Sequence, residues 1–190
     1  MSRSSFARGL AVLALSAALS ACGDTRTVTI SGTATSARPN AVNTLLEQGI
    51  RQAEANQLSQ AATTFEDILA VSPTNKYALY NLGLIDQERH DLSGAVARYN
   101  QALEADTTYT PAMYNKALIL ETSDPNASLA LYGRIVKLNP RASTAYLRMA
   151  IVYARHGKLP QAKQARARAI ALDPSLAKYQ LPRPCTTATC

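Results

Sequence analysis

From about Val42 onward, apolar residues recur every three or four positions, with polar residues between them. This spacing places the apolar side chains on one face of an α-helix, so the sequence predicts a series of amphipathic helices. Residues 25–41 (TRTVTISGTATSARPNA) differ, because they are rich in Thr, Ser and Ala and show no helical period. We therefore predict a flexible tether over residues 22–41, followed by an all-α domain.

The helical pattern is repeated at a nearly constant interval. The stretch ALYNLGLI at residues 78–85 returns as AMYNKALI from residue 112 and, more loosely, as AYLRMAIV from residue 145. One amphipathic helix pair cannot bury its own apolar face, whereas stacked pairs form a continuous core. The period therefore predicts an α-solenoid of stacked helix pairs.

These repeats resemble the tetratricopeptide repeat (TPR), in which small residues lie at the helix crossing, an aromatic residue fills the groove and proline ends the second helix. Four copies cover residues 42–75, 76–109, 110–142 and 143–176, within a repeat domain over 42–174. The third is one residue short in its turn, and the fourth has an arginine at the aromatic position. The resemblance implies a right-handed solenoid whose first helices line a concave groove. The matching residues are Gly49, Ala61, Phe65, Pro73, Leu79, Leu82, Gly83, Ala95, Tyr99, Ala102, Ala117, Tyr132, Pro140, Ala150, Tyr153, Gly157, Ala162, Ala169 and Pro174.

The resemblance also indicates the side chains that face this groove. They form an apolar trough with a polar ladder of Asn81, Asn115 and Arg148. Asparagine can both donate to and accept from the backbone of a bound segment, and tyrosine adds a large contact area with a polar tip. We predict that the groove binds an extended peptide or helix of a protein partner, and that alanine replacement of the ladder leaves the fold intact. The alternative is that the Tyr and Asn residues only pack between repeats. The predicted groove residues are Tyr77, Tyr80, Asn81, Leu84, Tyr114, Asn115, Leu118, Leu147, Arg148, Ile151 and Arg155.

The N-terminus has the features of an export signal. Two arginines precede the apolar run LAVLALSAAL, which is too short to span a membrane and of the length of a signal-peptide core. The following LSAC resembles the lipobox of bacterial lipoproteins, which implies removal of residues 1–21 and attachment of lipid, including palmitate, at Cys22. The alternative is an ordinary signal peptide with a chance cysteine. We predict a lipid anchor on the extracytoplasmic side of a membrane in the bacterial cell envelope.

Residues 175–190 are predicted to form a short cap with a cysteine pair. Because an exported protein occupies a disulfide-permissive compartment, we expect Cys185 and Cys190 to be paired, with intermolecular bonds or free thiols as alternatives. Two prolines limit any helix here, so the apolar edge of the last repeat is expected to stay partly open and to contact a partner or a second copy, as a homo-oligomer. The alternative is a tail that folds back over this edge. The residues of the edge are Ile170, Leu172, Leu176 and Tyr179.

Charge is distributed unevenly along the chain, whose formal net charge is +7. Residues 22–126 carry seven basic and twelve acidic side chains, whereas residues 127–190 carry eleven basic and one acidic. We interpret the basic run at 155–168 as a solvated face or a contact with anionic lipid or an acidic partner, and expect no nucleic acid. His90 and His156 are predicted in turns without a nucleophile or carboxylate pair, so we predict no enzyme, cofactor or metal site.

The predicted function is that of an extracytoplasmic, membrane-anchored TPR adaptor that holds another envelope protein. TPR lipoproteins of pilus-assembly systems are similar in layout, which implies a role in pilus, secretion or cell-wall complexes. Two alternatives stay open. One is a self-associating structural solenoid, and the other is a non-catalytic adaptor of a peptidoglycan enzyme. Chaperone-tail binding is disfavoured, because only Asn115 and Arg148 match the carboxylate-binding residues of such TPR grooves.

Overall fold

The computed structural model describes residues 37–184, with side chains from Ala41 onward. These residues belong to one compact unit, which runs from Ala34 to Cys190 and contains every described hydrophobic cluster. The predicted signal peptide, the lipidation site Cys22 and the cysteine pair Cys185–Cys190 lie outside the described residues.

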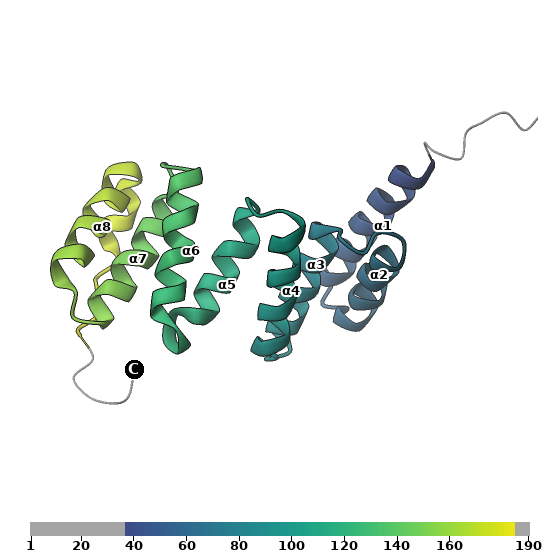
Figure 1. Ribbon diagram of the computed structural model, residues 1–190, viewed down its shortest axis with the longest axis horizontal. Helices are drawn as coiled ribbons and strands as arrows, with labels where there is room; N and C mark the ends of the chain where they lie inside the picture. The colour runs from purple at the N-terminus through teal and green to yellow at the C-terminus, as the bar shows by residue number, and fades with distance from the viewer. Residues whose placement is uncertain (1–36, 185–190) are drawn as a thin grey trace, which may run out of the picture. The chain divides into compact units, whose positions relative to one another are not determined.

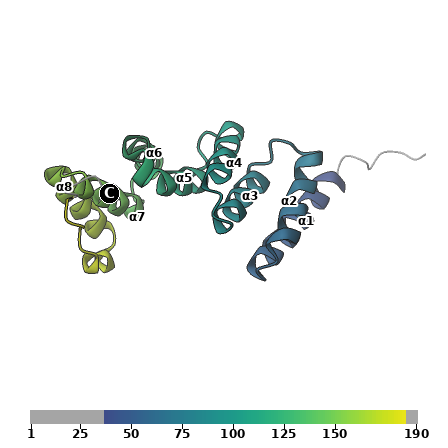
Figure 2. The same ribbon diagram turned by 90° about the horizontal axis from the view of Figure 1, so that it is seen from below.

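Residues 37–184 form eight α-helices and one 3-10 helix. Figures 1 and 2 show the α-helices as four successive antiparallel hairpins, each packed against the next, which confirms the predicted all-α solenoid. No helix in this range has the length and apolar character needed to span a membrane. The elements are α1 (Ala37–Glu54), α2 (Leu58–Val71), α3 (Lys76–Glu88), α4 (Leu92–Ala105), α5 (Thr110–Ser123), α6 (Pro125–Leu138), α7 (Ser143–Arg155), α8 (Leu159–Leu172) and η1 (Pro174–Lys178).

Helix α1 begins inside the segment that the sequence pattern assigns to the tether. Its first turn contains Pro39. A proline is tolerated there because the first N–H groups of a helix have no partner within the helix. The tether prediction is therefore too long at its C-terminal end.

Polar caps and prolines set the other helix ends. The side chains of Asn75, Asp91 and Asp124 each accept a hydrogen bond from a backbone N–H in the first turn of α3, α4 and α6. Helices α2, α6 and α8 end two residues before Pro73, Pro140 and Pro174, as predicted.

The hairpin turns explain the short third repeat. Asn56, His90 and Gly157 occupy equivalent places in the first, second and fourth hairpins, and all three have positive φ angles. In the third hairpin this residue is missing, and Asp124 follows α5 directly and caps α6. His90 and His156 both lie in exposed turns, as predicted, and His90 adopts the left-handed backbone that reverses the chain.

The crossing of the two helices in a hairpin is built from a small residue and an aromatic ring. Phe65, Tyr99 and Tyr132 are fully buried, as the repeat pattern predicts. A Cβ atom added at Gly49 would lie 2.6 Å from Phe65 Cε1, and one added at Gly83 would lie 2.5 Å from Tyr99 Cε1. The aromatic ring therefore occupies the space that a larger residue at the crossing would need.

Arginine replaces this aromatic ring in the last hairpin and binds the C-terminal segment. Arg166 Nε donates to Tyr179 O at 3.1 Å, and Nη2 donates to Ala177 O at 2.8 Å. Leu176 of η1 is only 7% exposed and packs against Leu147 and Ala169. The prediction of an open apolar edge is therefore wrong for Leu176, because the tail folds back over the last hairpin, as the alternative proposed.

Candidate protein-binding face

The predicted groove residues all lie on α3, α5 and α7, which with α1 are the first helices of the hairpins. We call the surface formed by these four helices the first-helix face. Along it the structure separates the predicted residues into an aromatic cluster, a buried ion-pair cluster and an open groove between α1 and α3.

The aromatic cluster joins α3 to the start of α5. The Tyr109 ring makes edge-to-face contacts with Tyr77 at 5.8 Å and with Tyr80 at 5.5 Å between centroids. Lys76 Nζ lies 5.1 Å from the Tyr77 centroid and 5.2 Å from the Tyr109 centroid, within cation–π range. Burial, followed by neighbouring charges, raises the pKa of Tyr109 to about 12, so its hydroxyl stays neutral at physiological pH. Tyr80 and Tyr109 therefore act mainly in packing between repeats, while Tyr77 remains 46% exposed.

Both asparagines of the polar ladder already have hydrogen-bond partners in the protein. Asn115 Nδ2 donates to Tyr80 Oη at 3.1 Å, across neighbouring repeats. Asn81 Nδ2 donates to Tyr77 O at 2.7 Å, within its own helix. Asn115 therefore packs between repeats, as the alternative interpretation proposed. Asn81 differs, because its side-chain carbonyl oxygen remains available to accept from another donor.

Arg148, the third ladder residue, belongs to a buried ion-pair cluster. Its Nε and Nη2 atoms donate to the two carboxylate oxygens of Glu121 at 2.7 and 2.6 Å. Arg155 Nη1 lies 3.4 Å from Glu121 Oε2, and Tyr132 Oη donates to Glu121 Oε1 at 3.0 Å. Glu121 is 3% exposed. Since its carboxylate engages both arginines, they are structural partners of α5 rather than free contacts for a ligand.

Four predicted groove residues have mainly packing roles. The prediction that Leu147 faces the groove is wrong, because its side chain is only 7% exposed and contacts Leu176 of the cap. Tyr114 makes an edge-to-face contact with the Tyr132 ring at 5.7 Å. Leu118 and Ile151 are half-buried.

An open groove of about 500 Å³ lies between α1 and α3 on the first-helix face. Asn81 and Leu84 are the two predicted residues that line it. Two carboxylates, Glu54 and Glu88, lie at its rim, and no basic side chain lines it. The other lining residues are Ile50, Ala53, Asn56, Leu58 and Ile85. This is an apolar groove with an acidic rim, suited to an aliphatic side chain next to a positive charge.

The roles of Glu121 and of α1 were not predicted from the sequence. In the sequence, Glu121 looks like an ordinary polar residue at the end of a helix. One signal was present, because Gln87 occupies the equivalent place 34 residues earlier. Each of the two residues accepts a hydrogen bond from the tyrosine hydroxyl of the following helix: Gln87 from Tyr99 at 3.1 Å, and Glu121 from Tyr132. The first repeat also places Ile50 and Glu54 one helical turn apart, on the face that adjoins α3.

A surface ion pair next to the aromatic cluster gives a pH-dependent test. Lys76 Nζ donates to Asp106 Oδ2 at 2.6 Å, and this bond, with those from Thr108, lowers the pKa of Asp106 to about 2. Because the folded pKa is below the usual 3.8, the contribution to stability is present above that value and is lost as pH falls towards 2. We expect the difference in unfolding free energy between wild type and Asp106→Asn to vanish over this interval in urea titrations. The exposed Glu104→Gln is the matched control, and a difference that persists at pH 2 would contradict the assignment.

The four hairpins and the small-residue crossings define a helical-repeat scaffold for protein–protein interaction. A family model described as tetratricopeptide repeat matches residues 46–108 and 120–177, more than half of the chain. The chain belongs to the tetratricopeptide repeat family.

Solved structures support the same fold. A crystal structure of MamA superposes with a TM-score of 0.66 at 22% sequence identity, covering 75% of this chain and 84% of that chain. A second MamA crystal structure gives 0.64 at 22% identity, with coverages of 77% and 80%. MamA 41-end from Desulfovibrio magneticus RS-1 gives 0.62 at 18% identity, with 70% and 76%. At these identities the likeness shows the fold alone, and no curated protein matches the chain.

Proposed function

We propose that the protein is a TPR adaptor that holds a segment of a partner protein in the groove between α1 and α3. The observation that carries this proposal is the combination of apolar floor and acidic rim in an open groove. Elsewhere on the first-helix face, the predicted contacts are engaged in packing and ion pairs. Asn81 and Leu84, by contrast, are the predicted residues that line an open groove.

The groove chemistry specifies the kind of segment. Leu84 and Ile50 provide apolar contact area, so the segment carries an aliphatic or aromatic side chain. Glu54 and Glu88 are exposed, and neither has a hydrogen bond or ion pair in the described part of the chain, so a flanking Lys or Arg of the partner would meet both. Asn81 would accept a hydrogen bond from the partner's backbone.

The place of action that we propose rests on the N-terminal sequence. A lipid at Cys22 would hold the adaptor on the extracytoplasmic side of a membrane in the bacterial envelope. There the partner would belong to a pilus, secretion or cell-wall complex. The adaptor of a peptidoglycan enzyme is a second form of the same proposal, in which the captured segment belongs to that enzyme.

Charge reversal at the rim tests the groove. We expect Glu54→Lys and Glu88→Lys each to reduce partner capture from native membranes by roughly tenfold or more, because like charges would then face each other. Asn81→Ala should reduce it by about two- to tenfold, the loss of one net hydrogen bond. Capture is measured by quantitative mass spectrometry of the proteins retained by each variant.

Glu104→Lys is the matched control, because it makes the same charge change on α4, outside the groove. It should retain the partner that wild type retains. If all three groove variants retain the same partner at wild-type levels, with normal helical circular dichroism, the α1–α3 groove is not the binding site.

A further inference from the structure

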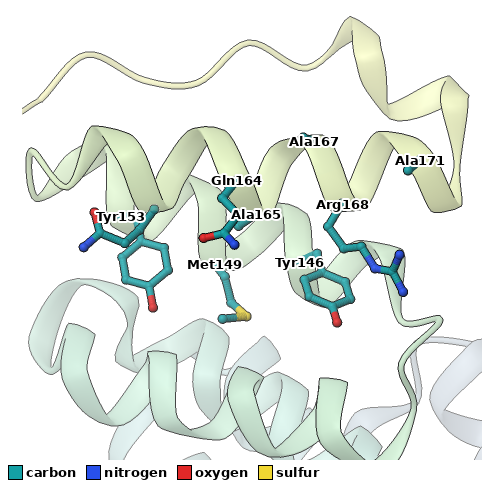
Figure 3. A pocket seen from close by; sticks show the side chains of 9 residues that line it. Tyr146, Met149, Tyr153, Gln164, Ala165, Ala167, Arg168 and Ala171 are labelled. Atoms are coloured by element: carbon teal, nitrogen blue, oxygen red, sulfur yellow. The ribbon is translucent and has the colours of Figure 1, made fainter.

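The last hairpin carries a second groove, separate from the α1–α3 groove. It encloses about 600 Å³ between α7 and α8. Figure 3 shows the side chains of Tyr146, Met149 and Tyr153 in a row that points to one side of the hairpin, with Arg168 beside Tyr146. Helix α8 contributes small side chains and two amides, Gln161 and Gln164, for which no hydrogen bond is found within residues 37–184. This α7–α8 groove thus has an aromatic floor and a polar edge.

The floor is open because the last repeat differs from the earlier ones. Leu79 in the second repeat and Met113 in the third repeat occupy the place of Tyr146, and both are buried. Tyr146 itself is only half-buried. One reason is on α8, where Ala165 stands at the place of Arg98 in α4 and cannot cover the larger floor residues.

The surroundings of the α7–α8 groove are strongly positive. Residues 143–184 contain eight basic side chains and one acidic side chain, Asp173, which caps η1. No carboxylate lines the groove. Arg168 lies at its edge, with the guanidinium carbon 6.0 Å from the Tyr146 centroid. The groove therefore favours an occupant that presents carboxylates next to an apolar side chain.

The first hairpin of the same chain presents such a surface. On α2, Glu66, Asp67, Ala70 and Val71 are all exposed and lie one helical turn apart in two adjacent rows. Val71 is 70% exposed, the highest value among the large exposed hydrophobic residues of the described chain. Residues 41–72 carry four acidic side chains and one basic. This α2 surface complements the α7–α8 groove in both charge and polarity.

We propose that the α7–α8 groove receives the α2 surface of a second copy of this protein. Val71 contacts the floor formed by Met149 and the two tyrosines, and Asp67 pairs with Arg168. The two surfaces lie on different hairpins, so the contact is head-to-tail and the dimer keeps one free groove on one copy and one free α2 surface on the other. Association therefore continues beyond the dimer. This inference goes beyond the proposed adaptor function, because it uses no residue of the α1–α3 groove.

Sedimentation velocity of residues 34–190, the compact unit, under reducing conditions tests the proposal. For wild type we expect a weight-average mass that rises with concentration at low ionic strength and falls towards the monomer at high salt. Asp67→Lys and Arg168→Glu should each weaken self-association by roughly tenfold or more, because each places like charges together. The double variant Asp67→Lys/Arg168→Glu should restore it, since the pair is rebuilt with its signs exchanged.

Arg183→Glu is the matched control, with the same change of charge on the exposed tail. It should behave as wild type, and circular dichroism checks the fold of each variant. Val71→Ser, on the opposite surface, should also weaken association and gives an independent readout if Arg168→Glu misfolds. The proposal is overturned if wild type stays monomeric at low salt, if Arg183→Glu equals Arg168→Glu, or if the double variant is not restored. Binding of a monomer to phosphatidylglycerol vesicles through Arg168 would likewise overturn it and assign the groove to membranes.

Discussion

Replacing Arg148 by methionine is expected to lower the free energy of unfolding by about 3–5 kcal/mol. The reason is Glu121, whose carboxylate is 3% exposed and receives two hydrogen bonds, at 2.7 and 2.6 Å, from this guanidinium. Without Arg148 the carboxylate stays buried, with the Tyr132 hydroxyl at 3.0 Å and Arg155 at 3.4 Å. Arg155 moderates the loss, so the lower part of this range is expected.

The double variant Glu121→Met/Arg148→Met separates charge burial from packing. Exchanging a buried ion pair for apolar residues of similar volume is often neutral or stabilising, so the double variant should be more stable than the single one. Lys137→Met, at an exposed position of α6, is the control and should stay within about 0.5 kcal/mol of wild type. Urea denaturation followed by circular dichroism gives these values. Equal losses in the single and double variants would show that the ion pair is not the cause.

The architecture could be predicted because residues within each repeat determine its two helices and their crossing. Apolar spacing fixes the buried face of every helix, and a proline after the second helix marks its end. Gly49 and Phe65 in the first hairpin stand at the places of Gly83 and Tyr99 in the second. The helix crossing of one hairpin therefore predicts that of the other. Even the missing residue of the third turn was visible as an interrupted period, and the structure places it where Asp124 joins two helices.

The binding face was predicted less well, because helical period gives a side chain's direction but not its partner. Asn115 and Tyr80 are 35 residues apart, and Arg148 and Glu121 are 27 apart, yet each pair is hydrogen-bonded between repeats. A polar residue that faces the groove in a single helix can thus be satisfied by the neighbouring repeat. The structure consequently gives Arg148 a role in stability, whereas the sequence predicted a contact with the partner whose replacement by alanine would leave the fold intact.

The C-terminal cap shows the same limitation at the end of the chain. Arg166 departs from the aromatic pattern, and in the sequence this departure only weakens the fourth repeat. In the structure its guanidinium binds the carbonyl groups of Ala177 and Tyr179, so the substitution fastens the tail. Leu147 becomes buried for the same reason, because Leu176 of the fastened segment packs against it.

Gly83→Ala is expected to destabilise the protein by about 1–3 kcal/mol, although alanine is by far the better helix former. The added Cβ would lie 2.5 Å from Tyr99 Cε1 and 2.8 Å from Cδ1. The Tyr99 ring cannot easily move aside, because it is fully buried and contacts the Tyr80 ring, and its hydroxyl donates to Gln87 Oε1 at 3.1 Å. Overpacking therefore outweighs the gain in helix propensity.

Gly133→Ala is the matched substitution, in the interior of α6, and here the sign should reverse. A Cβ at Gly133 would have no heavy atom within 4 Å apart from its own helix and chain neighbours. Only the propensity gain then remains, a stabilisation of about 0.5–1 kcal/mol. Both variants are compared by urea denaturation with wild type. If Gly83→Ala is as stable as Gly133→Ala, the aromatic ring does not set the distance between α3 and α4, and the crossing tolerates a methyl group as it does at Ala117 against Tyr132.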